Sequence, residues 1–168
     1  YYCYTSTEEL AQKRQEYEAK KQVFRFQSPW RDQKPPENSE VKPVIRIKSP
    51  KSGSTIINDL VQGKIEVANS ELDDMVILRS DGTPTYNLAV IVDDYDMNIS
   101  HIIRGDDHMN NSFRQKIIYD ALNWQMPQCA HIPLIHGSDG AKMSKRHGAT
   151  NVMEYAKMGY LSCAMRNY

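Results

Sequence analysis

The chain has 168 residues, of which 40% are hydrophobic and 25% are charged, and its formal net charge at pH 7 is zero. This composition is typical of a globular protein of one ordinary domain or two small ones, and it excludes a disordered chain. No apolar run is long enough to span a bilayer, so no membrane partner is expected. The three cysteines are scattered and lack C-x-x-C spacing, which argues against a disulfide framework or a zinc knuckle and favours a reducing cytoplasm.

The neutral total hides an uneven distribution of charge. Residues 11–51 hold eleven Lys or Arg against five Asp or Glu, residues 71–107 hold two against nine, and residues 108–168 hold seven against three. The first of these segments, the basic head (residues 11–51), suits contact with nucleic acid, whereas the acidic middle would repel it. A solvated surface helix explains part of the same excess equally well, so charge alone leaves both interpretations open.

The first predicted element is a helix that begins after Ser6. Ser6 and Glu9 have the spacing of a capping box, which favours a charged and mostly exposed helix to about Lys21. Residues 24–50 are rich in Pro, Lys and Arg and predict an irregular stretch that ends in a half-buried strand at residues 44–48.

Three further elements follow. Residues 55–67 are broken at Gly63, which predicts a short element and then a strand at residues 64–67. The apolar run at residues 75–79 has the profile of a buried strand. The sequence Ser-Asp-Gly-Thr-Pro at residues 80–84 closes this strand with a turn.

The next part of the chain alternates strand-like and helix-like segments. Residues 86–96 carry an apolar core whose periodicity fits either a helix or a strand. Residues 101–105 predict a second buried strand, and a helix capped by Asn111 or Ser112 follows to about Asn123. The predicted core face of that helix consists of Phe113, Ile117, Ile118, Ala121 and Leu122.

The last predicted elements surround a glycine-flanked segment. Residues 131–135 predict a third strand, and strand, helix, strand and then a glycine-flanked phosphate loop is the order of a parallel α/β sheet. Residues 151–158 predict a helix that Gly159 stops, and another helix begins near Leu161.

The loop at residues 141–150 reads Ala-Lys-Met-Ser-Lys-Arg-His-Gly-Ala-Thr and carries three cations, Lys142, Lys145 and Arg146. Glycines on both sides of the cations allow the backbone to change shape. Such a loop suits closure over a polyphosphate, because phosphoryl and nucleotidyl transfer depend on neutralising charge on the phosphate oxygens. An ordinary solvated basic patch is the alternative that the loop alone leaves open.

Four ordered blocks of sequence resemble the bacterial-type glutamyl-tRNA synthetases, a family of class I aminoacyl-tRNA synthetases. The blocks are Arg-Ser-Asp-Gly-Thr-Pro-Thr-Tyr-Asn at 79–87, Val-Asp-Asp at 92–94, Ile-Arg-Gly-Asp-Asp-His at 103–108 and Lys-Met-Ser-Lys-Arg at 142–146, which corresponds to the KMSKS signature. The resemblance is good from about residue 44 onward and looser before it. It implies an α/β fold, the second half of a Rossmann-like catalytic domain, and a helix over residues 86–96.

The same resemblance divides the chain into three parts. Residues 1–74 correspond to an inserted α+β region that binds the tRNA acceptor stem, and residues 75–140 to the second half of the catalytic domain. Residues 141–168 correspond to the signature loop and the start of a helical stem-contact region. The companion His-Ile-Gly-His signature and the anticodon-binding domain have no counterpart in this sequence, so the chain alone is expected to be catalytically weak or inactive.

The resemblance implies an ATP site built around the signature loop. Lys142 and Lys145 would stabilise the transition state at the α-phosphate and the leaving pyrophosphate, without a covalent enzyme intermediate. Asp107 corresponds to an acidic residue that helps to seat ATP, and Ile135 corresponds to the apolar contact for adenine. The expected ATP-binding residues are Asp107, Ile135, Lys142, Met143, Ser144, Lys145 and Arg146.

The resemblance also implies a glutamate pocket. Arg104, whose planar guanidinium can hold a carboxylate with two hydrogen bonds, would read the glutamate side chain, and Tyr86 would line the pocket. Without the motif, a structural ion pair with Asp93, Asp94 or Asp106 would be the expected role of this arginine.

No metal site within the protein is predicted, and Mg²⁺ is expected to arrive with ATP. Asp93 and Asp94 are adjacent residues that point apart, which argues against both binding one ion. Some relatives carry zinc near the start of the corresponding sequence. Here only Cys3 remains of that pattern, with Thr5 and Trp30 in place of ligands, and structural zinc needs four ligands.

The resemblance therefore implies a cytoplasmic, monomeric glutamate–tRNA ligase that activates L-glutamate with ATP and transfers it to the 3′ end of tRNA(Glu). One alternative is a glutamyl-queuosine tRNA(Asp) synthetase, although the signature loop of that enzyme usually departs from the Lys-Arg-His-Gly-Ala-Thr sequence found here. For the chain alone, a noncatalytic tRNA-binding module that uses the basic head is a second alternative.

Overall fold

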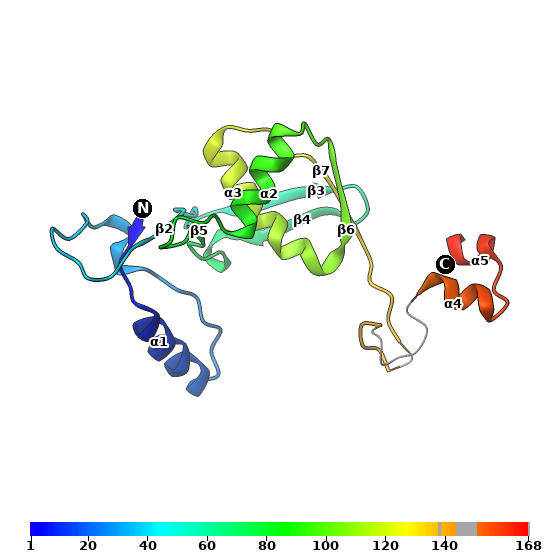
Figure 1. The fold of residues 1–168 in the computed structure, drawn as a ribbon, viewed down its shortest axis with the longest axis horizontal. Helices are drawn as coiled ribbons and strands as arrows, with labels where there is room; N and C mark the ends of the chain where they lie inside the picture. The colour runs from blue at the N-terminus through cyan, green and yellow to red at the C-terminus, as the bar shows by residue number, and fades with distance from the viewer. Residues whose placement is uncertain (138, 144–150, 168) are drawn as a thin grey trace.

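The computed structural model describes residues 1–137, 139–143 and 151–167. Figure 1 shows an elongated arrangement, with the N-terminal helix at one end, two sheets and two covering helices in the centre, and the C-terminal helices at the other end. The strands of the first sheet are β1 (Tyr2–Cys3), β2 (Val44–Arg46) and β5 (Val76–Leu78). The strands of the second sheet are β3 (Ser54–Asp59), β4 (Gly63–Ala68), β6 (His101–Gly105) and β7 (Gln128–Ile132).

Helix α1 (Thr7–Ala19) begins at the predicted capping box. Ser6 Oγ accepts a hydrogen bond from the Glu9 amide at 3.1 Å, and the Ser6 amide donates to the Glu9 carboxylate at 2.9 Å. No residue of the helix is buried, which confirms the prediction of an exposed helix. The helix ends at Ala19 because Lys21 adopts a left-handed conformation.

The first sheet is small and antiparallel, in the order β1-β2-β5. The predicted strand at residues 44–48 is present over Val44–Arg46, and the one at 75–79 is present over Val76–Leu78. The prediction that β5 is buried is wrong, since all three of its residues are half-buried. Its apolar run does not belong to the parallel sheet; it lies beside β2 and contacts helix α2.

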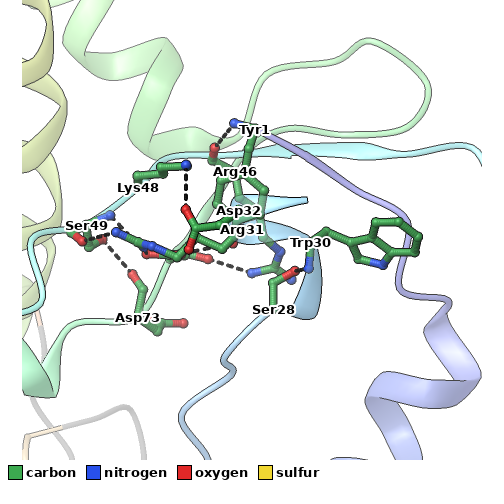
Figure 2. Close-up of polar contacts among 10 residues, drawn as sticks. Tyr1, Ser28, Trp30, Arg31, Asp32, Arg46, Lys48, Ser49 and Asp73 are labelled. Carbon is green, nitrogen blue, oxygen red and sulfur yellow. Dashed lines mark hydrogen bonds and ion pairs between the residues drawn. The ribbon is translucent and has the colours of Figure 1, made fainter. Parts of the chain in front are cut away.

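A buried carboxylate, Asp74, joins the start of the chain to this sheet. Figure 2 shows four of its partners, which are Tyr1, Arg31, Arg46 and Ser49. Asp74 accepts hydrogen bonds from the Tyr1 hydroxyl at 2.9 Å, from the Ser49 amide at 2.9 Å and from the Arg31 guanidinium. The Arg46 guanidinium donates to its backbone carbonyl at 2.6 Å. We call these five residues the Asp74 cluster. They hold together segments that are distant in sequence, including the short helix η1 (Pro29–Asp32) that carries Arg31.

The second sheet has the order β4-β3-β7-β6. Strands β3 and β4 form an antiparallel hairpin, whereas β7 pairs in parallel with β3 and with β6. The unit β6, α3 (Met109–Leu122) and β7 is therefore a parallel strand–helix–strand unit, as predicted. In each sheet, some strands precede residue 75 in the sequence and others follow it.

Two predictions about these strands are wrong in detail. Strand β6 was expected to be buried, but it lies at an edge of the sheet in the described part of the chain, and Ile103 is 70% exposed. Strand β7 begins at Gln128 and ends at Ile132, three residues before the predicted bounds at each end. Pro133 directly after β7 explains the early end, because proline has no amide hydrogen to give to a ladder.

Helix α2 (Tyr86–Asp96) confirms the helix expected from the family pattern, and it packs against α3 over the second sheet (Figure 1). One group of buried side chains lies between the helices and β5, and a second lies between α3 and the sheet. The first group is Met75, Ile91, Ile118 and Tyr119, and the second is Ile57, Phe113 and Cys129.

Helix α3 ends at Leu122, as predicted, but it differs from its prediction at its start and in part of its core face. It begins at Met109, so Ser112 lies inside the helix and does not cap it. Phe113, Ile117 and Ile118 are buried as predicted. Ala121 and Leu122 are exposed because Trp124 and Met126, from the loop that follows the helix, pack against the core in their place.

The C-terminal part contains α4 (Val152–Lys157) and α5 (Ser162–Asn167), which correspond to the two predicted helices. Asn151 caps α4, and Gly159 after it has the positive φ of 86° that a stop at glycine requires. No residue of either helix is buried. Across the described ranges, no helix has the length and apolar character to cross a membrane.

Candidate active site

An open cleft of about 480 Å³ lies at the carboxyl ends of the parallel strands β6 and β7. In open α/β sheets this edge is where ligands bind. Its walls are mostly apolar, with one arginine and one lysine among them. The lining residues are Ile103, Arg104, Gly105, Ile132, Pro133, Leu134, Ile135, Lys142 and Met143.

A tight reversal of the chain brings Lys142 back toward the end of β7. The Met143 amide donates to the Ile135 carbonyl at 2.9 Å, and the Gly137 amide donates to the Ala141 carbonyl at 2.9 Å. Gly140 has a φ of 74°, a conformation that side chains other than glycine rarely adopt. This turn therefore fixes the start of the signature loop beside the apolar wall of the cleft.

Lys142, which lines the cleft, forms an ion pair. Lys142 Nζ lies 2.6 Å from Asp107 Oδ2, and both side chains remain substantially exposed. The hydrogen bond from Lys142 lowers the pKa of Asp107 below its usual value. A Cβ added to Gly105 would lie 2.7 Å from Asp107 Oδ1, so glycine at this position allows the carboxylate to turn toward the lysine.

Arg104 extends from β6 toward helix α3. Its Nη2 donates to Ser112 Oγ at 2.6 Å and to Gln115 Oε1 at 2.9 Å, and its Nε donates to His131 Nε2 at 3.2 Å. Within the described residues it forms no ion pair with the acids that were expected as structural partners, Asp93, Asp94 and Asp106. Burial raises the pKa of Asp94, and the charge of Arg104 partly opposes that rise. A structural ion pair is therefore the wrong description of this arginine.

Behind Arg104 lies a buried pair, Asp59 and His131, that sequence reasoning missed. Asp59 Oδ2 is 2.6 Å from His131 Nδ1, and solvent reaches neither side chain. Asp59 also accepts the backbone amides of Val61, Gln62 and His131. Burial alone would raise the pKa of Asp59, but these hydrogen bonds lower it to about 2. No local motif links two residues that are 72 positions apart.

We expect the Asp59 carboxylate to contribute stability that disappears in acid. Its pKa of about 2 in the folded chain lies below the ordinary value of 3.8, so the unfolded chain takes up the proton first as pH falls. The contribution is complete above pH 4 and is lost as pH falls through 2, and it amounts to about 2 kcal/mol. Urea unfolding at pH 5 and pH 2.5 measures this loss. The free energy of unfolding of Asp59→Asn should fall less over that range than that of the wild type, and equal falls would contradict the assignment.

The structure brings five of the predicted site residues to this end of the sheet: Arg104, Asp107, Ile135, Lys142 and Met143. Tyr86 stands apart from them; it is the first residue of α2, is 58% exposed and is not among the residues that line the cleft. The predicted site residues Ser144, Lys145 and Arg146 lie outside the described residues.

The described ranges hold no cluster of three or more His, Cys, Asp or Glu side chains arranged for a metal ion. Cys3 accepts a hydrogen bond from Ser28 Oγ at 3.3 Å. Trp30 packs its ring edge-on against Tyr4, with 5.2 Å between the ring centroids. The side chains near Cys3 thus form a hydrogen bond and an aromatic contact.

The basic head exposes fewer unpaired cations than its composition suggests. Arg25 lies 3.9 Å from Glu71, Lys48 lies 2.8 Å from Asp32, and Arg31 is paired with Asp74. A cavity of about 470 Å³ in this region has both signs of charge on its walls. Contact with nucleic acid here would therefore use the remaining cations or displace these pairs.

A parallel strand–helix–strand unit with a cleft and a lysine at the carboxyl ends of its strands defines the class of open-sheet α/β proteins, in which ligands bind at that edge. The chain belongs to the class I tRNA synthetases of the E and Q type, since the model of their catalytic domain matches residues 1–168. It is 59% identical over 169 residues to glutamate–tRNA ligase 1 of Acidiphilium cryptum and 57% identical to glutamate–tRNA ligase 2 of Brucella ovis. Each alignment covers 100% of this chain and 36% of the relative, so the chain spans about a third of their length.

Comparison with solved structures leads to the same family. The chain superimposes with a TM-score of 0.79 and 34% identity on a glutamate tRNA ligase from Elizabethkingia meningosepticum, determined in complex with its amino acid. It superimposes with a TM-score of 0.80 and 33% identity on the glutamate-tRNA synthetase from Elizabethkingia anophelis. Each comparison covers 95% of this chain, and 33% and 34% of those chains respectively. The predicted family and α/β fold are thereby confirmed.

Proposed function

We propose that the chain is the part of a glutamate–tRNA ligase that holds the signature loop and one side of the active site. The enzyme would activate L-glutamate with ATP to glutamyl-adenylate and transfer it to the 3′ end of tRNA(Glu). The observation that carries this proposal is the match along the whole chain to glutamate–tRNA ligases at 57–59% identity. The convergence of cationic, acidic and apolar groups on one cleft supports it.

The cleft suits ATP in three ways. The apolar wall that includes Ile135 and Met143 offers a surface for adenine, and Lys142 at the rim offers a cation for the phosphates. Asp107 holds that lysine in place before ATP binds. In this proposal Lys145 joins Lys142 at the α-phosphate and pyrophosphate, with support from Ser144 and Arg146, and Mg²⁺ arrives with ATP. No resident zinc is proposed.

Arg104 is the residue that we assign to the glutamate side chain, with Tyr86 beside the substrate. In the described residues Arg104 Nη1 has no hydrogen-bond partner, whereas Nε and Nη2 are bound to the protein. A guanidinium held in this way keeps N–H groups available for a carboxylate.

The two ends of the chain would contact tRNA. Residues 1–74 would meet the acceptor stem through the basic head, and residues 141–168 would begin a stem-contact region next to the catalytic half at 75–140. The protein would act as a monomer in the cytoplasm. A glutamyl-queuosine tRNA(Asp) synthetase is less well supported, because the relatives named above are glutamate–tRNA ligases. A noncatalytic tRNA-binding module would require tRNA affinity that survives loss of Lys142 and Lys145.

The test uses a hybrid synthetase in which this chain replaces the matching segment of the Acidiphilium cryptum relative. We expect glutamate-dependent ATP–pyrophosphate exchange, measured with tRNA present, to lie within about tenfold of that of the parent enzyme. The chain alone, assayed in parallel, should give no exchange. A hybrid that folds and binds tRNA but gives no exchange would contradict the proposed function.

A further inference from the structure

A line of polar side chains crosses three neighbouring strands behind the cleft. Asp59 ends β3, His131 lies on β7, and Arg104 on β6 is the register partner of His131. We propose that Asp59 and His131 are positioning residues, which fix the guanidinium of Arg104 in the orientation that receives the glutamate side chain. This proposal rests on the proposed function, in which Arg104 binds glutamate.

The partners of His131 determine which ring nitrogen carries the proton. Arg104 Nε can only donate a hydrogen bond, so His131 Nε2, 3.2 Å away, must accept it. His131 Nδ1 therefore carries the proton and donates it to Asp59 at 2.6 Å. Asp59 is held in turn by the backbone amide of His131 at 3.1 Å. The carboxylate thus selects the tautomer, and the tautomer supplies the acceptor for Arg104.

The same groups have the order of a Ser-His-Asp triad, because Ser112 Oγ lies 3.1 Å from His131 Nε2. Ser112 and His131 are each 0% exposed, so no substrate reaches the hydroxyl. Ser112 Oγ instead accepts from Arg104 Nη2 at 2.6 Å. A nucleophilic role is therefore excluded, and all of these contacts act on the arginine.

Fixing this guanidinium matters because arginine has a long and flexible stem. Hydrogen bonds to His131, Ser112 and Gln115 hold Nε and Nη2, which sets the plane of the group and the direction of Nη1, the nitrogen without a partner among the described residues. A binding group that is already oriented loses less conformational freedom when its ligand arrives. Misorientation should therefore weaken glutamate binding before it affects the chemical step.

Asp59→Asn in the hybrid synthetase tests the tautomer directly. The amide keeps the shape of the carboxylate and can still accept the backbone amides, but its NH₂ would donate to His131 Nδ1. The proton would then move to Nε2 and face the Nε–H of Arg104, so two donors would oppose each other. We expect the KM for glutamate to rise about tenfold or more, the loss that a charge-assisted hydrogen bond implies. The KM for ATP should stay within about twofold, and kcat at saturating glutamate within about threefold.

Two variants of His131 separate positioning from folding. His131→Gln can place an amide oxygen near Arg104 Nε, whereas His131→Asn keeps a donor for Asp59 and removes the acceptor for the arginine. We expect His131→Gln to restore most of the glutamate KM and His131→Asn to raise it as Asp59→Asn does. Thr55→Val is the matched control, because Thr55 lies on the same strand as Asp59 and the substitution removes a buried hydrogen bond of 2.6 Å to Asn69. Its glutamate KM should equal that of the unsubstituted hybrid.

Arg104→Ala distinguishes failure of this inference from failure of the proposed function. An unchanged glutamate KM in Arg104→Ala would refute the glutamate assignment itself. A raised KM in Arg104→Ala with an unchanged KM in Asp59→Asn would overturn only the positioning role. Equal behaviour of His131→Gln and His131→Asn would also overturn it.

A spectroscopic measurement on the hybrid with Asp59 in place tests the tautomer even where Asp59→Asn does not fold. The ¹⁵N shifts of His131 in the labelled hybrid, assigned by comparison with His131→Gln, should identify a neutral ring protonated at Nδ1 at pH 7. A ring protonated at Nε2, or at both nitrogens, would overturn the inference.

Discussion

Replacing Lys145 by alanine in the hybrid synthetase should lower glutamate-dependent pyrophosphate exchange by about 10²- to 10³-fold, the loss typical of one preorganised group that stabilises transition-state charge. Lys145 is the second lysine of the signature loop. The first, Lys142, lies at the rim of the cleft, held by Asp107 at 2.6 Å. The loss should appear mainly in kcat, because the charge on the leaving pyrophosphate develops in the transition state.

Lys116→Ala is the matched control for this experiment. It removes the same charge from α3, outside the two segments proposed to contact tRNA, where the described structure pairs the lysine with Asp120 at 2.8 Å. Its exchange rate should stay within about twofold of the unsubstituted hybrid, as expected for an exposed pair. Equal losses in both variants would assign the effect to general charge, and a negligible loss in Lys145→Ala would remove the loop from the mechanism.

Replacing Asp74 by alanine should lower the free energy of unfolding by about 3 kcal/mol, the loss typical of breaking a buried ion pair. The substitution leaves the half-buried Arg31 guanidinium without its carboxylate and the Ser49 amide without its acceptor. It also removes the acceptor of the Tyr1 hydroxyl, 2.9 Å away. Urea unfolding monitored by circular dichroism measures the change.

The control variant for Asp74→Ala replaces Asp32, an aspartate that Figure 2 shows beside Lys48. Asp32 pairs with Lys48 at 2.8 Å, but both side chains are largely exposed. Asp32→Ala should therefore lower the free energy of unfolding far less than Asp74→Ala does, because solvent screens the exposed pair. Asp74→Asn keeps the shape of the side chain and should fall between the two alanine variants. If Asp32→Ala and Asp74→Ala destabilise equally, burial does not govern the strength of the Asp74 cluster.

Local signals in the sequence predicted the elements that local interactions determine. The capping box at Ser6 and Glu9 fixed the start of α1, and Gly159 marked the end of α4, because both depend on residues within one helical turn. The parallel unit around α3 followed from the order of its segments. Of the residues in the blocks that resemble the synthetase family, Arg104, Lys142 and Met143 line the cleft, whereas Tyr86 does not.

Contacts between distant segments could not be predicted in this way. The run at β5 has the apolar character of a buried strand, but its sheet depends on pairing with β2, about thirty positions earlier in the chain. Arg104 was expected to meet either a substrate or a nearby acid. Its observed partners on α3 and β7 depend on the register between two strands and on an aspartate from a third. Ser112 was expected as a helix cap, because its sequence context gives no sign of a buried partner.

The edge position of β6 has a consequence for how this chain would behave in isolation. A strand at a sheet edge presents a row of backbone N–H and C=O groups that another extended segment can join, and Ile103 beside them is apolar and exposed. Among the described strands β6 has no neighbour on that side, so the edge can pair with an extended segment of another polypeptide. Without such a segment, copies of the chain would compete for one another's edges, and their solubility would fall as concentration rises.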